Sequence, residues 1–333
     1  MRILIVTDAW LPQVNGVVTT LRKMQEGLTD VGHEVRFVTP QGFRSMACPT
    51  YPEIRLSLLP YGGVSREIES FSPDAIHIAT EGPLGSAARR YCLKRGLSFT
   101  SAFHTRFAEY VHARTRIPLE LTYGWLRRFH APSRALMVPT PAVRRDLEAR
   151  GFRNTVAWTR GVDTVTFSPG ERNQLDTERP VFLYVGRVAV EKNIEAFLKL
   201  ELPGSKWVVG EGPLRAHLEK KYPDVYFAGI KTPAELARYY RAADVFVFPS
   251  LTDTFGLVML ESLACGTPVA AYPVSGPIDV VGDSGAGVLH DDLAVACLRA
   301  LDVPREKARQ FAEQFSWRES VNQFASHLRQ VAS

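Results

Sequence analysis

Short apolar runs alternate with longer amphipathic stretches along almost the whole chain. The short runs are typical of strands buried in a parallel sheet, and the stretches between them are typical of helices that cover such a sheet. In the first half, strands are predicted at residues 3–6, 34–38, 75–78, 98–102 and 136–138, and helices at residues that include 19–31, 83–95 and 141–150. In the second half, strands are predicted at 181–185, 206–209, 225–227, 245–248, 268–271 and 287–289.

The two series of strands are separated by a polar stretch, residues 168–180, which is the best candidate for a linker. The predicted fold class is therefore α/β, with two Rossmann-like, doubly wound parallel-sheet domains that face a cleft. The predicted domains are residues 1–168, on the acceptor side, and 169–333, which binds the nucleotide. A terminal helix is expected at about 305–331, and the sequence leaves open whether it packs back onto the first domain.

Composition restricts the class of protein without identifying it. A chain of 333 residues, 45% hydrophobic and 23% charged, has the size and composition of a two-domain globular protein. The four cysteines are far apart and form no C-x-x-C pair, so they indicate neither a zinc site nor a disulfide framework. No apolar run approaches the ~18–20 residues that span a bilayer. We expect a cytoplasmic protein, or one attached peripherally to the cytosolic face of the inner membrane.

Positive charge is concentrated in residues 89–150, which hold 13 Lys and Arg against 4 Asp and Glu, whereas the formal net charge of the whole chain is +5. Aromatic residues are interspersed with these charges. A solvated helical surface explains the pattern as well as a surface that meets anionic lipid or an anionic acceptor. Nucleic acid is disfavoured as a partner, because no known nucleic-acid module is present.

The most informative segment follows the predicted strand 245–248. A loop leads into a helix that is expected to begin near Phe255 and Gly256, with Asp253 just before its start and Glu261 two turns along it. The N–H groups at a helix N-terminus attract an anion such as a phosphate, and glycine permits a close approach. The two carboxylates can accept hydrogen bonds from hydroxyls on either side of a bound diphosphate. This arrangement suits a nucleotide sugar.

A second candidate group follows the predicted strand 181–185. Arg187 follows Gly186 directly, and Lys192 lies five positions later, so the two cations span the loop and the first turn of a predicted helix, where the helix dipole favours negative charge. A diphosphate between the two cations explains their position, and such cations stabilise a departing nucleoside diphosphate. Two ordinary surface cations are the alternative.

Other positions carry weaker signals. The first loop lacks the G-x-G-x-x-G of a dinucleotide site, and its Gly16 either offers an N–H to the donor or belongs to a simple turn and cap. His104 follows a predicted strand and is expected at a ligand site, although a structural role is the alternative. The turn 210–213 either lines the nucleotide pocket or is purely structural. Asp163 is expected to order the chain before the linker.

Together these motifs resemble the retaining glycosyltransferases of family 4, which have the two-domain GT-B fold, and the resemblance covers nearly the whole chain. It implies that Glu261 holds the ribose hydroxyls and that Arg187 and Lys192 bind the diphosphate. It also implies that Asp253 and the amides of four residues grip the phosphate and hexose; these residues are Phe255, Gly256, Leu257 and Val258. His104 is then expected to contact the sugar near its anomeric carbon.

The chain departs from the family pattern at Asp253, where the family commonly has Glu. The residues around His104 and Asp253 resemble a bacterial subgroup that uses GDP-mannose or UDP-hexose, often with lipid acceptors such as diacylglycerol; a glycan acceptor is also compatible. The family typically needs no metal or other cofactor, and the sequence has no D-x-D motif. A nucleotide-sugar 2-epimerase on the same fold and a non-catalytic sugar-nucleotide-binding protein are the alternative functions.

Overall fold

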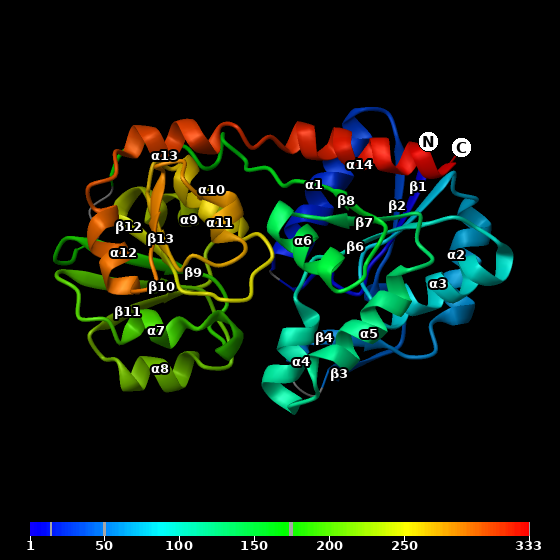
Figure 1. Cartoon of the computed structure of the whole chain (residues 1–333), viewed down its shortest axis with the longest axis horizontal. Helices are drawn as coiled ribbons and strands as arrows, with labels where there is room; N and C mark the ends of the chain where they lie inside the picture. The colour runs from blue at the N-terminus through cyan, green and yellow to red at the C-terminus, as the bar shows by residue number, and fades with distance from the viewer. Residues whose placement is uncertain (14, 49–50, 173–175, 333) are drawn as a thin grey trace. The chain divides into compact units, whose positions relative to one another are not determined.

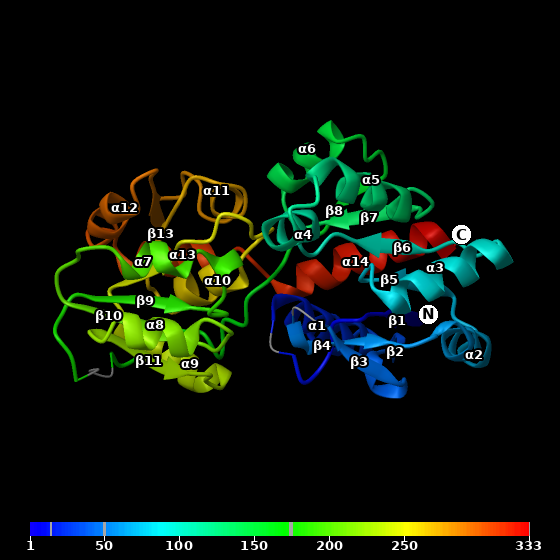
Figure 2. The same cartoon turned by 90° about the horizontal axis from the view of Figure 1, so that it is seen from below.

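The computed structural model describes residues 1–13, 15–48, 51–172 and 176–332. The chain divides into two compact units, the first made of Met1–Arg160 with Trp317–Ser333 and the second of Gly161–Ser316 (Figures 1 and 2). Within the described residues each unit has one six-stranded sheet in which all the strand pairs are parallel. Residues 173–175 of the predicted linker and Val14 of the first loop lie outside the described residues.

The sheet of the first unit has the order β2-β1-β5-β6-β7-β8. Its strands are β1 (Arg2–Val6), β2 (Glu34–Val38), β5 (Ala75–Ile78), β6 (Thr100–Ala102), β7 (Ala135–Val138) and β8 (Thr155–Ala157). A separate antiparallel pair consists of β3 (Ser45–Cys48) and β4 (Tyr51–Ser57). The helices are α1 (Gly16–Asp30), α2 (Tyr61–Phe71), α3 (Pro83–Arg95), α4 (Phe107–Thr115), α5 (Leu119–His130), α6 (Pro141–Ala149) and α14 (Trp317–Ala332), with a 3₁₀ turn η1 (Pro40–Gly42).

The sheet of the second unit has the order β11-β10-β9-β12-β13-β14. Its strands are β9 (Val181–Val185), β10 (Ser205–Val209), β11 (Val225–Gly229), β12 (Val245–Phe248), β13 (Val269–Ala271) and β14 (Gly287–Leu289). The helices are α7 (Ile194–Leu198), α8 (Arg215–Lys221), α9 (Pro233–Ala242), α10 (Leu257–Ala264), α11 (Pro277–Val280), α12 (Leu293–Ala300) and α13 (Arg305–Ala312), and a 3₁₀ turn η2 (Val190–Lys192) precedes α7.

Helices cover both faces of the first sheet because its strands are apolar on both sides. Successive residues of β1 point to opposite faces. Ile3 and Ile5 pack in one cluster with side chains of α1 and α14, whereas Leu4 and Val6 pack in another with side chains of α2 and α3. The alternation of helices and apolar runs therefore predicted this layering correctly.

The end of the chain differs from the expected single helix. Two helices form, α13 in the second unit and α14 in the first, and the division between units falls at Ser316 and Trp317. The break is explained by Phe315, which packs against the core of the second unit, while Phe324 and Leu328 of α14 are fully buried in the first. The last helix of the described chain thus completes the core of the first unit.

The other division lies at Arg160 and Gly161, earlier than the boundary at 168 that the polar stretch suggested. Val162 and Phe167 belong to the core of the second unit, and the Val162 amide donates to the Phe315 carbonyl oxygen at 3.1 Å. The Asp163 carboxylate accepts from the Val165 and Thr166 amides, each at 3.1 Å. Asp163 therefore orders the chain just after the division, before the predicted linker.

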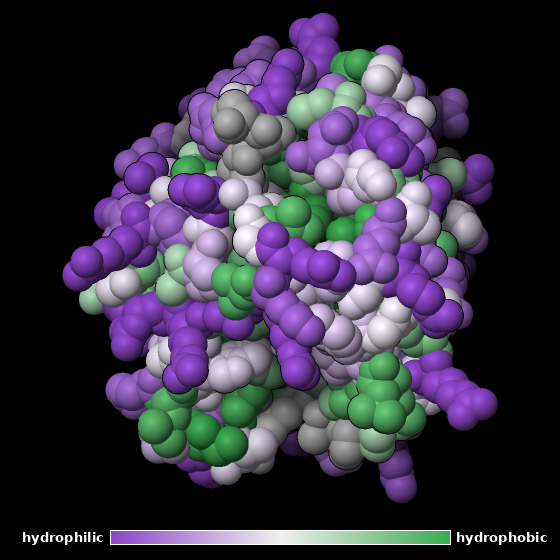
Figure 3. All heavy atoms as spheres, turned by 90° about the vertical axis from the view of Figure 1, so that its right-hand side faces the viewer, coloured by the Kyte–Doolittle hydropathy of each residue, from purple (hydrophilic) through white to green (hydrophobic). Residues whose placement is uncertain are grey.

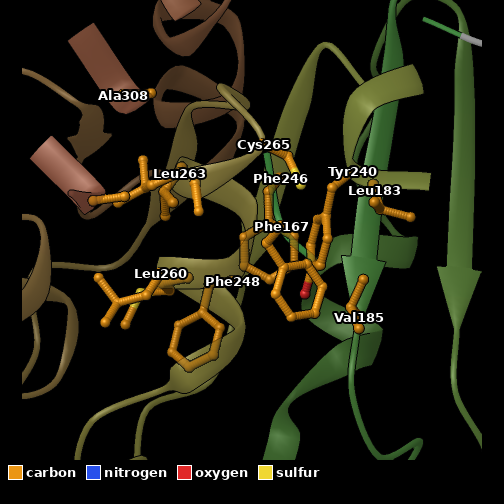
Figure 4. Close-up of a cluster of buried hydrophobic side chains, with 14 of the residues drawn as sticks. Phe167, Leu183, Val185, Tyr240, Phe246, Phe248, Leu260, Leu263, Cys265 and Ala308 are labelled. Carbon is orange, nitrogen blue, oxygen red and sulfur yellow. The ribbon is translucent and has the colours of Figure 1, made fainter. Parts of the chain in front are cut away.

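The larger core of the second unit lies on one side of its sheet, under α9, α10 and α13 (Figure 4). Leu183, Phe246 and Cys265 contribute to it from the sheet and from the end of α10. The Tyr240 ring stands beside Phe246, with ring centroids 5.6 Å apart, and extends along β9 toward Val185. This core fixes α9 and α10 against the carboxyl ends of β9 and β12.

The sequence pattern did not predict β3, β4 and β8. It also predicted that β2 and β14 would be buried strands. Thr155–Ala157 is only three residues long, and β3 is partly exposed, so neither gives a clear apolar run. The edge strands β2 and β14 are mostly half-buried rather than buried, because each has a neighbour on one side only.

Phe324→Ala is expected to destabilise the first unit. Phe324 is fully buried, and its ring centroid lies 4.8 Å from that of His77 and 4.9 Å from that of Trp158. The cavity left behind is expected to cost about 3–5 kcal/mol in the free energy of unfolding. Urea denaturation measures this loss, with Ser326→Ala on the exposed side of the same helix as the control. Equal midpoints for the two variants would contradict the burial of α14.

Candidate functional site

The strand order of the second unit reverses beside β9. The chain leaves β9 for β10 and β11 on one side and returns to β12 on the other side. Loops that follow two such neighbouring strands diverge, and ligands of doubly wound sheets bind in the space between them. Gly186 begins the loop after β9, and Pro249 begins the loop after β12. The predicted donor residues of the second unit come from these two loops and from α10.

Lys192 and Asp253 meet at this point. The Lys192 ammonium forms an ion pair with Oδ1 of Asp253, and both side chains are mostly buried. The other carboxylate oxygen, Oδ2, is buried without a hydrogen-bond partner within the described part of the chain. The Asn193 side chain donates to the Pro249 carbonyl oxygen at 3.1 Å, so the two loops are also joined directly. A cation and a carboxylate with a spare acceptor are thus held side by side.

Arg187 also has a carboxylate neighbour, which sequence analysis did not identify. Its Nε lies 3.8 Å from Oε1 of Glu191, and the Glu191 side chain is 6% exposed. The structure has a 3₁₀ turn here, followed by the five-residue α7, where the sequence predicted the start of a longer helix. The dipole of such a short helix is weak, so it does not set the partners of these two cations. Arg187 and Lys192 instead each lie beside an acid, and the i,i+4 spacing of Arg187 and Glu191 was the available signal.

Backbone segments approach closely around these side chains. Gly186 and Gly210 have φ of +152° and +141°, and a Cβ on Gly210 would lie 1.9 Å from the Gly186 carbonyl oxygen. A Cβ on Gly212 would lie 2.3 Å from the carbonyl oxygen of Val188, whose amide donates to the Glu211 carbonyl oxygen at 2.8 Å. The turn 210–213 therefore has a structural role, since it packs against the loop that contains Arg187.

The N-terminus of α10 has the form that the sequence predicted. Gly256 is the N-cap, with φ +87°, and a glycine offers no side chain to cap the first turn. A Cβ at this position would lie 2.8 Å from Cε of Met259 and 3.0 Å from Cζ of Phe248. Leu257 and Val258 supply the first amides of the helix, whereas the Phe255 side chain is buried in the core. An uncapped helix start follows directly after the Lys192–Asp253 pair.

Glu261 lies in the second turn of α10, and a side chain of the core holds it in place. Its Oε2 accepts from the Tyr240 hydroxyl at 3.1 Å, and Tyr240 belongs to α9. Burial raises the pKa of Glu261 to about 7, and the Tyr240 hydrogen bond acts in the opposite direction. Glu261 therefore titrates near neutral pH. Tyr240 is a further site residue that sequence analysis did not find, because no local spacing links α9 to α10.

Two of the predicted site residues, Gly16 and His104, belong to the first unit. Gly16 is the first residue of α1, and the Asn15 side chain caps that helix by accepting from the Val17 and Val18 amides, each at 3.0 Å. The simpler alternative, a turn with a cap, thus describes this segment. No contact shows that Gly16 binds a donor, and that role stays a prediction.

The strand order of the first unit reverses between β1 and β5, and an internal carboxylate lies there. Asp8 follows β1, and its Oδ1 accepts from the Leu84 amide at 2.9 Å. Oδ2 accepts from the Gly85 amide at 3.3 Å and from the Thr80 hydroxyl at 2.9 Å. Burial raises the pKa of Asp8, while these hydrogen bonds oppose the shift. The N-terminus of α3 is therefore occupied by a side chain of the protein.

His104 follows β6 and is half-buried against Trp158, with ring centroids 5.5 Å apart. Its Nδ1 lies 3.4 Å from a guanidinium nitrogen of Arg160. Burial, with the nearby Arg160 and His77, lowers the pKa of His104 well below its ordinary value. The imidazole is therefore neutral at pH 7. If His104 stabilises charge on a ligand, the neutral ring does so through its dipole or through a hydrogen bond.

Family models and relatives match nearly the whole chain. The model described as "Glycosyltransferase Family 4" matches residues 14–166, and that described as "Glycosyl transferases group 1" matches residues 179–302. A GDP-mannose-dependent alpha-mannosyltransferase of Mycobacterium tuberculosis is 30% identical over 87% of this chain and 83% of its own length. An alpha-monoglucosyldiacylglycerol synthase of Streptococcus pneumoniae is 28% identical over 90% of this chain and 78% of its own length.

Solved structures share the fold. A sucrose-phosphate synthase from Thermosynechococcus elongatus superposes with a TM-score of 0.78 at 20% identity, over 99% of this chain and 98% of that chain. HepE from Anabaena, in complex with UDP and glucose, gives a TM-score of 0.74 at 15% identity, over 99% of each chain. These similarities, with the two parallel sheets, confirm the predicted α/β fold of the GT-B type. Among the described residues, the helices are too short or too polar to cross a bilayer.

The stability of the protein is expected to depend on the titration of Glu261. Its folded pKa of about 7 exceeds the ordinary value of 4.5, so its contribution to stability is fully present below pH 4.5 and is lost as pH rises through 7. Glu261→Gln should remove this dependence, so that the variant gains stability over wild type between pH 4.5 and 7. Denaturant titrations at several pH values measure the difference.

Tyr240→Phe is the companion variant in this experiment. It removes the hydrogen bond that lowers the pKa of Glu261, so the loss of stability should move to higher pH. A constant stability difference between Glu261→Gln and wild type across this range would show that Glu261 does not titrate as described.

Proposed function

Because the chain belongs to the glycosyltransferases of family 4, we propose that it transfers a hexose of the mannose or glucose type from a nucleoside-diphosphate sugar to a lipid or glycan acceptor. The transfer retains the anomeric configuration. The observation that supports this function most strongly is the Lys192–Asp253 pair at the strand reversal, followed by the uncapped start of α10. The pair offers a cation to a phosphate and a carboxylate to sugar hydroxyls.

In the proposed reaction the diphosphate approaches Lys192, Arg187 and the first amides of α10. These groups stabilise the negative charge that grows on the leaving phosphate as its bond to the sugar breaks. Oδ2 of Asp253, buried without a partner among the described residues, accepts from a hydroxyl of the hexose. Glu261 accepts from the ribose hydroxyls, and Tyr240 holds it in place. The leaving phosphate takes the proton of the acceptor hydroxyl on the same face of the sugar.

The names of the relatives guide the proposed substrates. One relative is named for GDP-mannose as its donor, and another for the synthesis of a glucosylated diacylglycerol. We propose GDP-mannose or a UDP-hexose as donor, with no metal or other cofactor, and a diacylglycerol-like lipid as the first acceptor to test. None of the relatives named above is an epimerase, which leaves that alternative without support.

A surface of α4 and α5 suits a membrane that carries such an acceptor. Leu121 and Trp125 expose 67% and 45% of their surface, and Phe107 exposes 43% with its ring centroid 6.2 Å from that of Trp125. Arg89 and Arg128 line a hollow of about 170 Å³ beside Trp125. Exposed apolar groups beside arginines match the boundary of a bilayer that contains anionic phospholipid.

Figure 3 looks onto the side of the first unit. Most of this face is hydrophilic, and apolar groups gather along its lower margin. Our proposal is that the enzyme binds peripherally to the cytosolic face of the membrane through the surface of α4 and α5.

Lys192→Ala is expected to lower kcat/KM for hexose transfer by about 10²-fold or more, because it removes a cation that faces the leaving phosphate. Lys199→Ala is the matched control, since Lys199 is a nearby lysine whose side chain is 63% exposed. Both variants are assayed with GDP-mannose, UDP-glucose and UDP-galactose, and donor binding is followed by thermal shift. Full turnover by Lys192→Ala would refute the proposed role.

Wild-type protein is expected to float with vesicles that contain phosphatidylglycerol, and to bind less as salt rises. The double variant Leu121→Gln/Trp125→Gln should lose most of this binding, whereas Ile230→Gln should keep it. Ile230 is a matched control because it is 59% exposed and lies in the second unit. Binding that is insensitive to salt, or equal for both variants, would overturn the proposed membrane surface.

A further inference from the structure

Arg160 is a buried cation at the carboxyl end of β8, and it is 3% exposed. One guanidinium nitrogen donates to the carbonyl oxygens of Trp158 and Thr159 at 2.7 and 3.1 Å. The other lies 3.4 Å from Nδ1 of His104. The guanidinium carbon lies 4.0 Å from the centroid of the Trp158 ring, within the range of a cation–π contact. Backbone carbonyls, an aromatic face and one imidazole therefore surround this charge.

The environment of Arg160 is unusual because it lacks an acid. Among the described residues no carboxylate lies within ion-pair distance of its guanidinium, and burial lowers its pKa to about 9. At neutral pH the side chain remains charged. A buried charge without a counter-ion costs stability, and the backbone carbonyl oxygens and the imidazole offset part of that cost.

The contact between Arg160 and His104 determines which ring nitrogen of the neutral imidazole carries the proton. A guanidinium has only N–H donors, so Nδ1 of His104 must be the acceptor in this contact. The neutral ring then carries its proton on Nε2. A proton on Nδ1 would face the N–H groups of Arg160, which disfavours both the other tautomer and the imidazolium. His77 and Trp158 are the other ring neighbours that act on this histidine.

We propose that Arg160 is a positioning residue that holds His104 neutral, with the proton on Nε2. This inference rests on the proposed function, in which His104 contacts the hexose near its anomeric carbon. In that role the N–H at Nε2, an atom that is buried among the described residues, is the donor for an oxygen of the donor sugar or its phosphate. The ring stays uncharged, and its donor is oriented before the substrate arrives.

The support for Arg160 extends to α14. The Trp158 indole N–H donates to the hydroxyl and carbonyl oxygens of Ser320, at 3.1 and 3.2 Å. The Thr159 amide donates to the Gln323 side chain at 3.0 Å, and the Ser320 hydroxyl donates to the Thr159 carbonyl oxygen at 2.8 Å. The segment that surrounds the guanidinium is thus fixed by two residues of α14. Ser320 and Gln323 act on His104 only through this segment.

The test is the tautomer of His104, measured by NMR on full-length protein with ¹⁵N-labelled histidine and without substrates. Wild type should show the Nε2–H form, with no titration near pH 6.5. Arg160→Met should give a mixture of tautomers and a pKa that rises toward 6.5, while Arg160→Lys should keep the Nε2–H form because ammonium is also a pure donor. Nδ1–H in wild type, or an unchanged tautomer and titration in folded Arg160→Met, overturns the proposal.

Kinetics provide the second readout. Arg160→Met should lower kcat by about 10²-fold with a smaller change in KM for the donor, and the acid-side loss of activity should begin at a higher pH than in wild type as His104 becomes protonated. Arg160→Lys should restore much of kcat. Arg305→Met is the control, because Arg305 also donates to buried carbonyl oxygens but lies in the second unit. An unchanged pH profile in Arg160→Met would contradict the role.

The two readouts separate this inference from the proposed function. The tautomer is measured without donor or acceptor, so a protein that transfers no hexose can still show the Nε2–H form. If Arg160→Met does not fold, the wild-type spectrum alone decides the tautomer, and Arg160→Lys supplies the kinetic comparison.

Discussion

The strand order of each parallel sheet reverses once, and the chemistry of each unit depends on what lies at that reversal. Loops diverge there because the chain continues to opposite sides of the sheet. In the first unit the place is filled by Asp8, whose carboxylate accepts from the first amides of α3. In the second unit, Lys192 and Asp253 meet beside the start of α10, where the N-cap is a glycine. The same strand reversal thus holds an internal carboxylate against a helix N-terminus in the first unit, and an ion pair beside a glycine-capped helix N-terminus in the second.

The buried and partly buried cations of the two units have different kinds of partner. Around β9 each cation has an acid beside it, since Arg187 lies near Glu191 and Lys192 pairs with Asp253. These pairs keep the site close to electroneutral, which lowers the cost of holding two cations in a partly buried place. Arg160 in the first unit is satisfied by carbonyl oxygens and an imidazole instead. Its charge therefore acts on His104 rather than on an acid.

Much of the fold followed from the sequence, because strands with both faces buried leave unmistakable apolar runs. Lys192 and Asp253 could also be placed at one edge of a sheet, since each follows a predicted strand and their strands are neighbours. Their ion pair confirms that placement, although their roles toward a donor stay predictions. The 3₁₀ turn at 190–192 was harder to foresee, because a turn of three residues has no periodicity.

Contacts between distant positions were beyond sequence analysis. Tyr240 reaches Glu261 from another helix, and Trp158 reaches Ser320 across more than a hundred residues of intervening chain. Neither spacing nor composition encodes such contacts in a single sequence. The division at Arg160 was missed for a related reason: a polar stretch marks exposed chain, whereas the division between units is set by which core buries Val162 and Phe167.

The position of α14 at the end of the described chain determines which of the two cores is complete first during synthesis. Residues 161–316 are continuous in the chain, so the second unit holds all of its core once they have left the ribosome. The first unit lacks Phe324 and Leu328 until translation has passed them, although its sheet is synthesised earlier. The nascent chain therefore exposes the part of this apolar sheet face that α14 later covers, and exposed apolar surface of this kind is a target for a chaperone on the ribosome.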